Sequence, residues 1–103
     1  MGRIIRHDEA EQDLFETWFF LAQESSVERA ESFLDQIETT LSTLATHPYM
    51  GRSRSDLLPG MRSFPVGAYL VFYLPHADGG GIDLLRVLDS RRDVDALFEG
   101  GES

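Results

Sequence analysis

The sequence contains no cysteine and no long run of apolar residues. Without cysteine, the chain can form no disulfide, no thiolate nucleophile and no cysteine-based zinc site, and it suits a reducing compartment. No apolar stretch is long enough for a signal peptide or a membrane span. We therefore expect a cytoplasmic protein without a membrane partner.

Lysine is also absent, so all nine basic residues are arginines, and the net charge is −9. Proteins that capture nucleic acid neutralise phosphates with clustered Lys and Arg, so the charge argues against strong direct nucleic-acid binding. Residues 1–47 carry ten acidic residues and three arginines, whereas residues 48–92 carry six arginines and four aspartates. The length and the ordinary globular composition predict one domain over residues 1–98 and a flexible tail over 99–103.

The first half of the chain predicts a short strand followed by a helix. The strand covers residues 3–7, and Asp8 then offers a capping carboxylate for the helix. Helical periodicity gives this helix an apolar arc that should face the core, formed by Leu14, Phe15, Trp18, Phe19, Leu21 and Ala22. Phe20 falls on the opposite, solvated side, among Asp13, Glu16 and Glu24. It is either a lone exposed aromatic residue or a contact for a partner, since aromatic residues are enriched at interfaces.

A second helix completes a helical hairpin. Its start is predicted at a capping box in which Ser25 is the cap and Glu28 reaches back. It ends before Pro48, because the residue that precedes a proline disfavours the helical conformation. Its narrow apolar stripe consists of Val27, Ala30, Phe33, Leu34, Ile37, Leu41, Leu44 and Ala45. Residues 48–60 contain two Pro and two Gly and should form a connecting loop.

Three strands are predicted next, over residues 61–66, 68–74 and 82–88, and then a short helix or arm over 91–98. Gly67 marks the first turn between these strands, and residues 77–81 mark the second. The middle strand is apolar at every position, which is typical of a central strand covered on both faces. A helical hairpin covers only one face. The other face must therefore meet the C-terminal segment or another chain, through either Tyr69, Val71 and Tyr73 or Leu70, Phe72 and Leu74.

Four segments in this order resemble the ParE/RelE toxin superfamily, and most of all its ParE branch. They are Pro48-Tyr49-Met50-Gly51-Arg52, Leu57-Leu58-Pro59-Gly60-Met61-Arg62, Tyr69-Leu70-Val71-Phe72-Tyr73 and Leu85-Arg86-Val87-Leu88-Asp89-Ser90-Arg91-Arg92-Asp93. The resemblance implies an α+β fold in which an N-terminal strand and a helical hairpin pack on an antiparallel β-sheet. It also implies a toxin of a type II toxin–antitoxin system whose partner is a ParD-like antitoxin.

The resemblance to the superfamily implies one of two activities. The RelE branch cuts messenger RNA on the ribosome, whereas the ParE branch is associated with inhibition of DNA gyrase. RNA cleavage needs a base, an acid and cations at the phosphate. The resemblance matches the family arginines to Arg62 and Arg86, with Arg91 or Arg92 as a third cation. Both strand arginines have an equally strong structural alternative, which for Arg86 is an ion pair with Asp83, Asp89 or the C-terminal carboxylates.

The acid and base of the RelE branch have no counterpart here. The chain has no lysine and no tyrosine beyond Tyr73, and His76 falls at a hairpin turn without an evident partner. Asp89 stands where members of the family often have histidine, and a carboxylate there repels a phosphate unless an arginine or a metal intervenes. The favoured hypothesis is therefore a non-enzymatic inhibitor of DNA gyrase, as implied by the ParE branch. The alternatives are a ribosome-dependent endoribonuclease and a non-toxic module that binds the antitoxin.

We expect protein partners and neither a cofactor nor a metal. His7 and His47 lack the spacing of metal ligands, and Gly79-Gly80-Gly81 precedes a strand rather than a helix that could bind phosphate. The candidates for partner contact are Phe20, Arg52, Arg54, Tyr69 and Tyr73. Because the chain is so acidic, the docking segment of the antitoxin should be amphipathic and carry basic residues.

Overall fold

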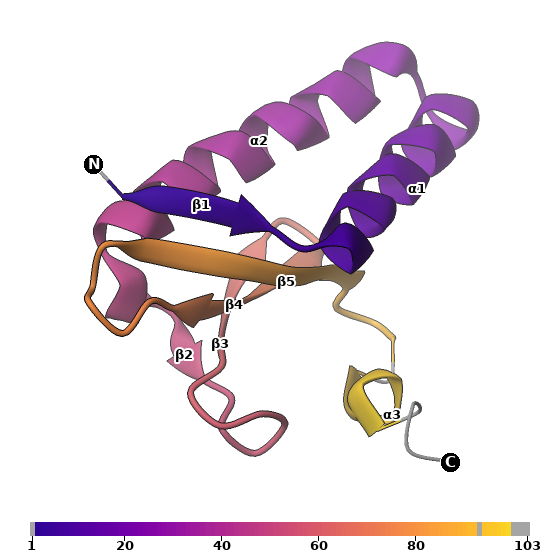
Figure 1. The fold of residues 1–103 in the computed structure, drawn as a ribbon. Coiled ribbons are helices and arrows are strands. Elements are labelled where there is room, and N and C mark those ends of the chain that lie inside the picture. The colour runs from indigo at the N-terminus through magenta and orange to yellow at the C-terminus, as the bar shows by residue number, and fades with distance from the viewer. Residues whose placement is uncertain (1, 93, 100–103) are drawn as a thin grey trace.

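The computed structural model describes residues 2–92 and 94–99 (Figure 1). The elements are β1 Arg3–Arg6, α1 Asp8–Glu24, α2 Val27–Thr46, the 3-10 helix η1 Pro48–Met50, β2 Arg52–Ser53, β3 Arg62–Val66, β4 Tyr69–Pro75, β5 Gly81–Asp89 and α3 Val94–Glu99. The predicted first strand, helical hairpin, three later strands and short last helix are confirmed, and the loop adds η1 and β2. Of the predicted tail, residues 100–103 lie outside the described residues, while Glu99 closes α3. The domain boundary stays a prediction.

The strands form one sheet in the order β1-β5-β4-β3-β2. Strands β2 to β5 pair in antiparallel fashion, whereas β1 lies parallel to β5, with Ile4 opposite Ile82. The α+β class is confirmed, but the sheet is mixed rather than purely antiparallel. The residue pattern of β1 does not indicate whether it runs parallel or antiparallel to its neighbour in the sheet. The helical hairpin that follows β1 is compatible with both directions.

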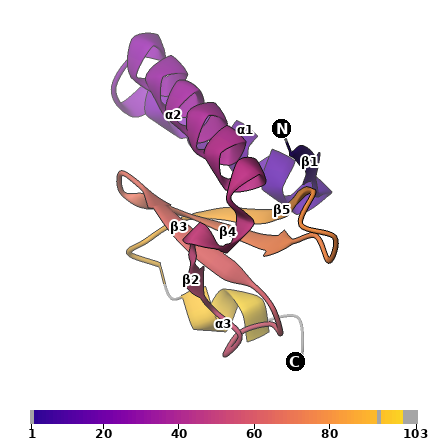
Figure 2. The ribbon, with the colours of Figure 1, turned by 90° about the vertical axis from the view of Figure 1, so that its left-hand side faces the viewer.

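The main core lies between the helical hairpin and one face of the sheet. Figures 1 and 2 show α1 and α2 on this face and α3 on the opposite face. Each large apolar side chain that the core removes from water contributes roughly 1.5–3 kcal/mol. The fully buried members include Ile37, Leu41, Leu44, Val71, Tyr73, Ile82 and Leu84. The apolar stripe predicted for α2 is thus confirmed as the face that covers the sheet, except at its first residue, Val27, which is 54% exposed.

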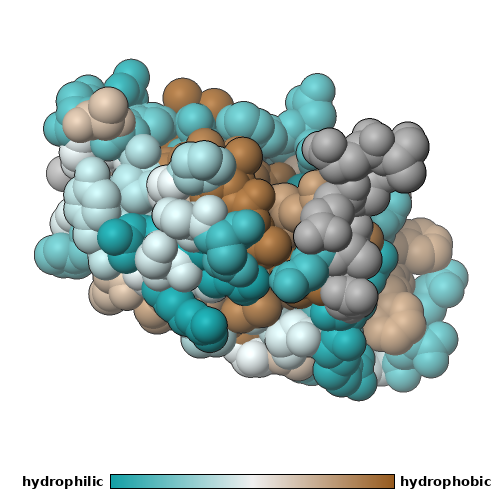
Figure 3. Space-filling view, turned by 90° about the horizontal axis from the view of Figure 1, so that it is seen from below, coloured by the Kyte–Doolittle hydropathy of each residue, from teal (hydrophilic) through white to brown (hydrophobic). Residues whose placement is uncertain are grey.

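Strand β4 is buried on both faces, as its unbroken apolar sequence predicts. Val71 and Tyr73 belong to the main core, whereas Phe72 belongs to a second cluster on the other face of the sheet. The buried members of the second cluster are Met61, Phe72, Leu88 and Val94, and Leu57, Leu70, Leu74, Leu85, Leu97 and Phe98 pack against them. Viewed from below, apolar side chains gather near the middle of the face (Figure 3). The C-terminal segment therefore meets the second face, one of the two predicted possibilities.

The start of the second helix differs from its prediction by one residue. Ser26, not Ser25, caps α2, because its hydroxyl accepts a hydrogen bond of 3.0 Å from the backbone N–H of Arg29. The start of α1 differs in the same way: Asp8 is its first helical residue and His7 occupies the cap position without a side-chain hydrogen bond. Both shifts leave the hairpin in place.

The outer surface of α1 is where the predicted core is wrong. Phe15 is 64% exposed and Phe19 is 48% exposed, although both lie in the predicted core arc. Asp13, predicted on the solvated side, is only 8% exposed. The helix packs on α2 and on β5, so the stripe that it buries is narrower than its apolar arc and is rotated toward Ala10 and Asp13.

Candidate functional site

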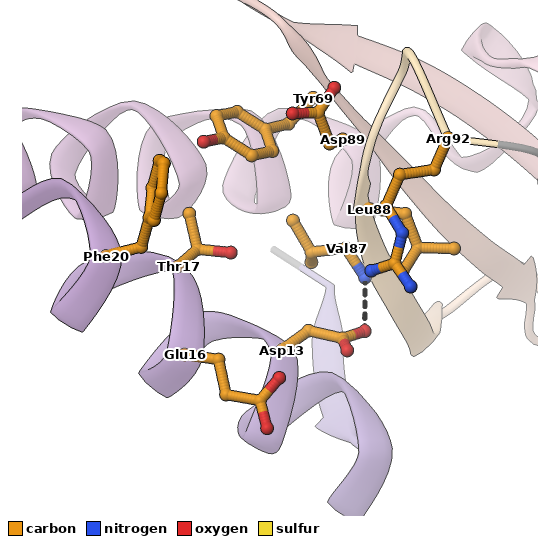
Figure 4. Close-up of a pocket in the computed structure, with 9 residues that line it drawn as sticks. All are labelled: Asp13, Glu16, Thr17, Phe20, Tyr69, Val87, Leu88, Asp89 and Arg92. Atoms are coloured by element: carbon orange, nitrogen blue, oxygen red, sulfur yellow. Dashed lines mark hydrogen bonds between the residues drawn. The ribbon is translucent and has the colours of Figure 1, made fainter. Parts of the chain in front are cut away.

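A pocket opens where α1 faces the end of β5 (Figure 4). Its volume is about 310 Å³, and it is lined by Asp13, Glu16, Thr17 and Phe20 from α1, Tyr69 from β4, Val87, Leu88 and Asp89 from β5, and Arg92. It brings together three residues that the sequence singled out, namely Phe20, Tyr69 and Arg92. Other hollows on the surface are larger, but this pocket collects the predicted residues and is therefore the candidate site.

The floor of the pocket is a carboxylate that ties α1 to the sheet. Asp13 accepts two hydrogen bonds from Arg86, at 2.8 and 3.0 Å. It also accepts one of 2.9 Å from the backbone N–H of Val87, which Figure 4 marks with a dashed line. The hydrogen bond from Arg86 to Asp13 raises the pKa of the guanidinium above its usual range. Arg86 therefore forms a structural ion pair, one of the two alternatives considered for it, but its partner is Asp13 rather than Asp83 or Asp89. Part of the C-terminal carboxylates, the third expected partner, lies outside the described residues.

Asp13 is the residue that the sequence analysis missed. It precedes Leu14 and follows Ala10 by three positions, so it lies at the edge of the buried stripe of α1. An acidic residue at that edge, combined with an arginine on an apolar strand, is the signal that could have identified the pair. Neither residue alone carries the signal, because acids on helices usually face solvent.

The rim of the pocket holds a second carboxylate, Asp89. Arg91 donates to it at 3.0 and 2.7 Å from its side chain and at 2.9 Å from its backbone N–H. These bonds, the side-chain ones foremost, lower the pKa of Asp89 to about 2. An arginine does intervene beside this carboxylate, and so low a pKa makes Asp89 a poor proton acceptor at neutral pH.

The lowered pKa of Asp89 gives a pH dependence with a definite sign. The folded pKa of about 2 lies below the usual value of 3.8, so this contribution to stability is present above pH 3.8 and is lost as the pH falls toward 2. Replacing Asp89 by asparagine should lower the free energy of unfolding at pH 7 by about 1 kcal/mol or less, because solvent screens the pair. Urea unfolding of both proteins from pH 7 to pH 2 measures the difference, which should shrink at the acidic end. Glu24→Gln is the control, and a difference that stays constant over this range would contradict the assignment.

Two aromatic side chains form the apolar part of the pocket. Phe20 is 56% exposed, and Tyr69 is half-buried with its ring 5.0 Å from that of Phe33. Burial of Tyr69 raises the pKa of its hydroxyl. In Figure 4 these two rings lie on the side of the pocket opposite Arg92. The pocket therefore presents exposed aromatic surface beside carboxylates and one arginine, a combination typical of protein contact sites.

Tyr73 lies elsewhere, and its prediction as a partner contact conflicts with its burial. The side chain is 0% exposed. Its hydroxyl accepts a hydrogen bond of 2.9 Å from the backbone N–H of Gly51 and donates one of 2.8 Å to the carbonyl of Pro48. Only glycine fits at position 51, because a Cβ there would lie 2.4 Å from the Tyr73 hydroxyl. Tyr73 thus fastens the turn after α2 to the sheet.

Arg62 holds the same turn from outside. Its Nη1 donates to the carbonyl of Gly51 at 2.7 Å and to that of Tyr49 at 3.3 Å, and its guanidinium lies 5.2 Å from the centre of the Tyr49 ring. These contacts give Arg62 a structural role on β3. Of the two alternatives considered for this arginine, a structural one and a catalytic one, they support the structural one.

The two loop arginines differ from each other. Arg54 pairs with Asp56 at 3.2 Å and with Asp95 at 3.5 Å, lies 5.9 Å from the centre of the Phe72 ring, and has a side chain only 14% exposed. It therefore links the loop to α3. Arg52 is exposed on β2 and forms no ion pair with another described residue. The predicted contact residues thus do not form one surface, since Phe20 and Tyr69 share the pocket and the arginines lie on the loop.

His76 has a partner that the sequence did not reveal. Its Nε2 lies 3.0 Å from an oxygen of Asp83, whereas its buried Nδ1 has no partner among the described residues. Over residues 2–92 and 94–99, no three His, Cys, Asp or Glu side chains are arranged to hold a metal ion. Within the same ranges, no helix is long and apolar enough to cross a membrane.

Comparisons with known proteins agree on one family. The family model for the ParE toxin of the type II toxin–antitoxin system parDE matches residues 4–94. Toxin ParE3 of Caulobacter vibrioides is 35% identical over 96 residues, which cover 93% of this chain and 94% of that protein. Toxin ParE1 of Mycobacterium tuberculosis is 31% identical over 94 residues, covering 91% and 95%. A solved structure described as the chromosomal ParDE TA system from P. aeruginosa shares the fold, with a TM-score of 0.71 and 19% identity over 86% of this chain and 96% of that chain.

Proposed function

Because the chain belongs to the family of ParE toxins of type II toxin–antitoxin systems, we propose that it inhibits DNA gyrase through protein contact. A ParD-like antitoxin neutralises it, and both act in the cytoplasm. Gyrase is the target that the ParE branch implies, and the chain resembles this branch most. No residue of the toxin is given a catalytic role.

The main observation in support of a non-enzymatic role is that the two arginines on the strands, Arg62 and Arg86, already form hydrogen bonds within the fold. Arg86 is bonded to Asp13 through two nitrogens, and Arg62 is bonded to two backbone carbonyls. A nuclease needs such cations turned toward a phosphate, with a base and an acid beside them. The carboxylate that stands in place of the family histidine, Asp89, has its pKa lowered to about 2, far from that of a working base at neutral pH.

The pocket between α1 and β5 is the surface that we assign to the target. Its exposed Phe20 is an aromatic side chain of the kind that is enriched at protein interfaces. Truncating one of the few residues that dominate such an interface costs about 2 kcal/mol or more. Carboxylates and Arg92 around it supply a polar rim. The toxin then acts by occupying a surface of gyrase rather than by changing a bond.

The test is a supercoiling assay with purified gyrase and relaxed plasmid. The wild-type toxin should block supercoiling, and Phe20→Ala should need at least about tenfold more protein for the same block. Val27→Ala is the control, because Val27 is 54% exposed at the start of α2 and does not line the pocket. Supercoiling that persists at high concentrations of the wild-type toxin would contradict gyrase inhibition. A block that Phe20→Ala leaves unchanged would contradict the pocket as the contact site.

A further inference from the structure

A hollow on the surface lies beside β2, where α2 passes into η1. Its volume is about 620 Å³, and it is lined by Thr46, His47, Pro48, Tyr49 and Met50. None of these residues lines the pocket between α1 and β5. In the strand order, β2 forms the edge of the sheet opposite to β1 (Figure 1). The hollow is therefore a separate feature at the far edge of the sheet.

Two consecutive apolar side chains are exposed at this hollow. Tyr49 is 61% exposed and Met50 is 45% exposed. The guanidinium of Arg62 lies 5.2 Å from the centre of the Tyr49 ring, and its Nη1 donates a hydrogen bond to the carbonyl of the same residue. The Tyr49 ring is thus held in place before a partner arrives, which lowers the entropy cost of binding.

The surrounding part of the chain is nearly free of acidic residues. Residues 39–77 contain one of the 18 acids, Asp56, and three arginines, which is a formal charge of +2 in a chain of −9. Asp56 is bonded to Arg54. Arg52 and Arg62 form no ion pair within residues 2–92 and 94–99, since the bonds of Arg62 go to backbone carbonyls. Two positive charges therefore remain uncompensated near the exposed tyrosine and methionine.

The two uncompensated arginines lie on opposite faces of the sheet at its edge. Arg52 is in register with Ser63, and Arg62 precedes Ser63 on β3, so their side chains alternate across the sheet. A segment that passes over the edge therefore has an arginine on each side. Tyrosine, methionine and arginine are also among the residue types enriched at protein interfaces, whereas aspartate and glutamate are depleted there.

We propose that the edge surface, formed by Tyr49, Met50, Arg52 and Arg62, binds an extended acidic segment of a partner protein. An apolar side chain of the segment fills the hollow, and its carboxylates face the arginines, with which they form charge-assisted hydrogen bonds. That the partner is gyrase rests on the function proposed above.

Charge favours such a segment over two other occupants. A second copy of the chain, docked symmetrically, would bring Arg52 against its own equivalent. A nucleic acid carries a phosphate charge at every nucleotide, and the net charge of −9 repels such a dense charge more strongly than a short acidic segment. A few carboxylates interspersed with apolar side chains match both the charge and the exposed apolar area of the edge surface.

Three labelled probes test the chemistry of the occupant on the full chain. The first is a peptide of about ten residues, roughly 33 Å long when extended, with a central leucine and phenylalanine flanked by aspartates. The second has asparagine in place of each aspartate, and the third is a single-stranded oligonucleotide. Fluorescence anisotropy should show at least about tenfold tighter binding of the acidic peptide than of the other two, with an affinity that falls as salt is added. Equal affinities of the two peptides, or tighter binding of the oligonucleotide, would overturn the proposal.

Matched variants locate the binding site. Arg52→Glu and Tyr49→Ala should each weaken binding of the acidic peptide by about tenfold. Met50→Ala leaves the stacked ring in place and should act in the same direction, which separates a lost contact from a disturbed turn. Arg3→Glu makes the same charge change on β1, and Phe19→Ala removes a 48% exposed ring from α1, so both should leave the affinity within about twofold. Equal losses in the two sets would overturn the edge surface as the site.

The supercoiling assay tests gyrase as the partner of this surface. Arg52→Glu should raise the toxin concentration needed for the block by at least about tenfold, whereas Arg3→Glu should leave it within about twofold. A block that Arg52→Glu leaves unchanged would overturn gyrase as the partner, and a toxin dimer in sedimentation that this variant abolishes would assign the surface to a second copy. Failure of the wild-type toxin to block supercoiling would instead remove the proposed function and leave the peptide result standing.

Discussion

Replacing Asp13 by asparagine is expected to lower the free energy of unfolding by about 2–4 kcal/mol. The carboxylate is 8% exposed and accepts both bonds from Arg86 as well as the N–H of Val87. The amide of asparagine cannot balance the guanidinium, so the change leaves a largely buried charge without its partner. The loss stays below that of a fully buried pair, because the side chain of Arg86 keeps 21% of its exposure. Urea unfolding at neutral pH measures it.

A double-mutant cycle provides the control for this pair. Asp13→Leu and Arg86→Met should each destabilise the chain, whereas the two together should cost clearly less than the sum, because no unpaired charge remains. A coupling energy of about 1–3 kcal/mol is expected for groups in direct contact. Strictly additive losses would show that the ion pair does not fasten α1 to the sheet.

Replacing Tyr73 by phenylalanine is expected to cost about 2–4 kcal/mol, although it removes a single oxygen atom. The hydroxyl satisfies the N–H of Gly51 and the carbonyl of Pro48 in a buried place, so its loss leaves two backbone groups without partners. Leaving one buried polar group unpaired costs roughly 1–3 kcal/mol. The melting temperature and the urea midpoint both report this change.

Tyr69→Phe is the matched control for Tyr73→Phe. Both residues lie on β4, but Tyr69 is only half-buried and its hydroxyl forms no hydrogen bond within residues 2–92 and 94–99. Its replacement should change stability by no more than about 0.5 kcal/mol. If the two substitutions had the same effect, the turn after α2 would not depend on the Tyr73 hydroxyl.

Local patterns were sufficient to predict the parts of the fold whose signal is periodic. The stripe of α2 repeats over five turns and points to one buried face, and β4 is apolar at every position and lies between two layers. Gly67 and the glycines at 79 and 81 adopt a positive φ at the predicted turns. In each case the residues that form the element also determine its environment.

Contacts between distant segments were not predictable in this way. The direction of β1 depends on β5, at the other end of the chain, and the burial of Asp13 depends on Arg86, 73 positions away. Phe15 and Phe19 belong to the apolar arc predicted for α1, yet α2 and the sheet cover other residues of that arc and leave these two exposed. Tyr73 was considered a partner contact because one face of its strand had to be covered by the C-terminal segment or by another chain. Its side chain is instead buried against the helical hairpin, and its hydroxyl bonds to the backbone of a turn 22 residues earlier.

The candidate site combines both kinds of information. Phe20 could be singled out as an aromatic residue on the charged side of its helix, and Tyr69 as part of an apolar strand that a helical hairpin covers on one face only. That they line one pocket with Arg92 follows only from the packing of α1 on β5. Arg86 was a candidate residue for RNA cleavage, and the same packing places it in an ion pair with Asp13.

The central claim is that the toxin stops DNA replication by binding gyrase, and induced expression in bacteria tests it most directly. DNA synthesis and protein synthesis are followed separately by pulse labelling, with and without a co-expressed ParD-like antitoxin. We predict that DNA synthesis stops first, that protein synthesis continues at early times, and that the antitoxin restores growth. An immediate arrest of translation would contradict the claim in favour of messenger RNA cleavage, and unimpaired growth would contradict toxicity itself.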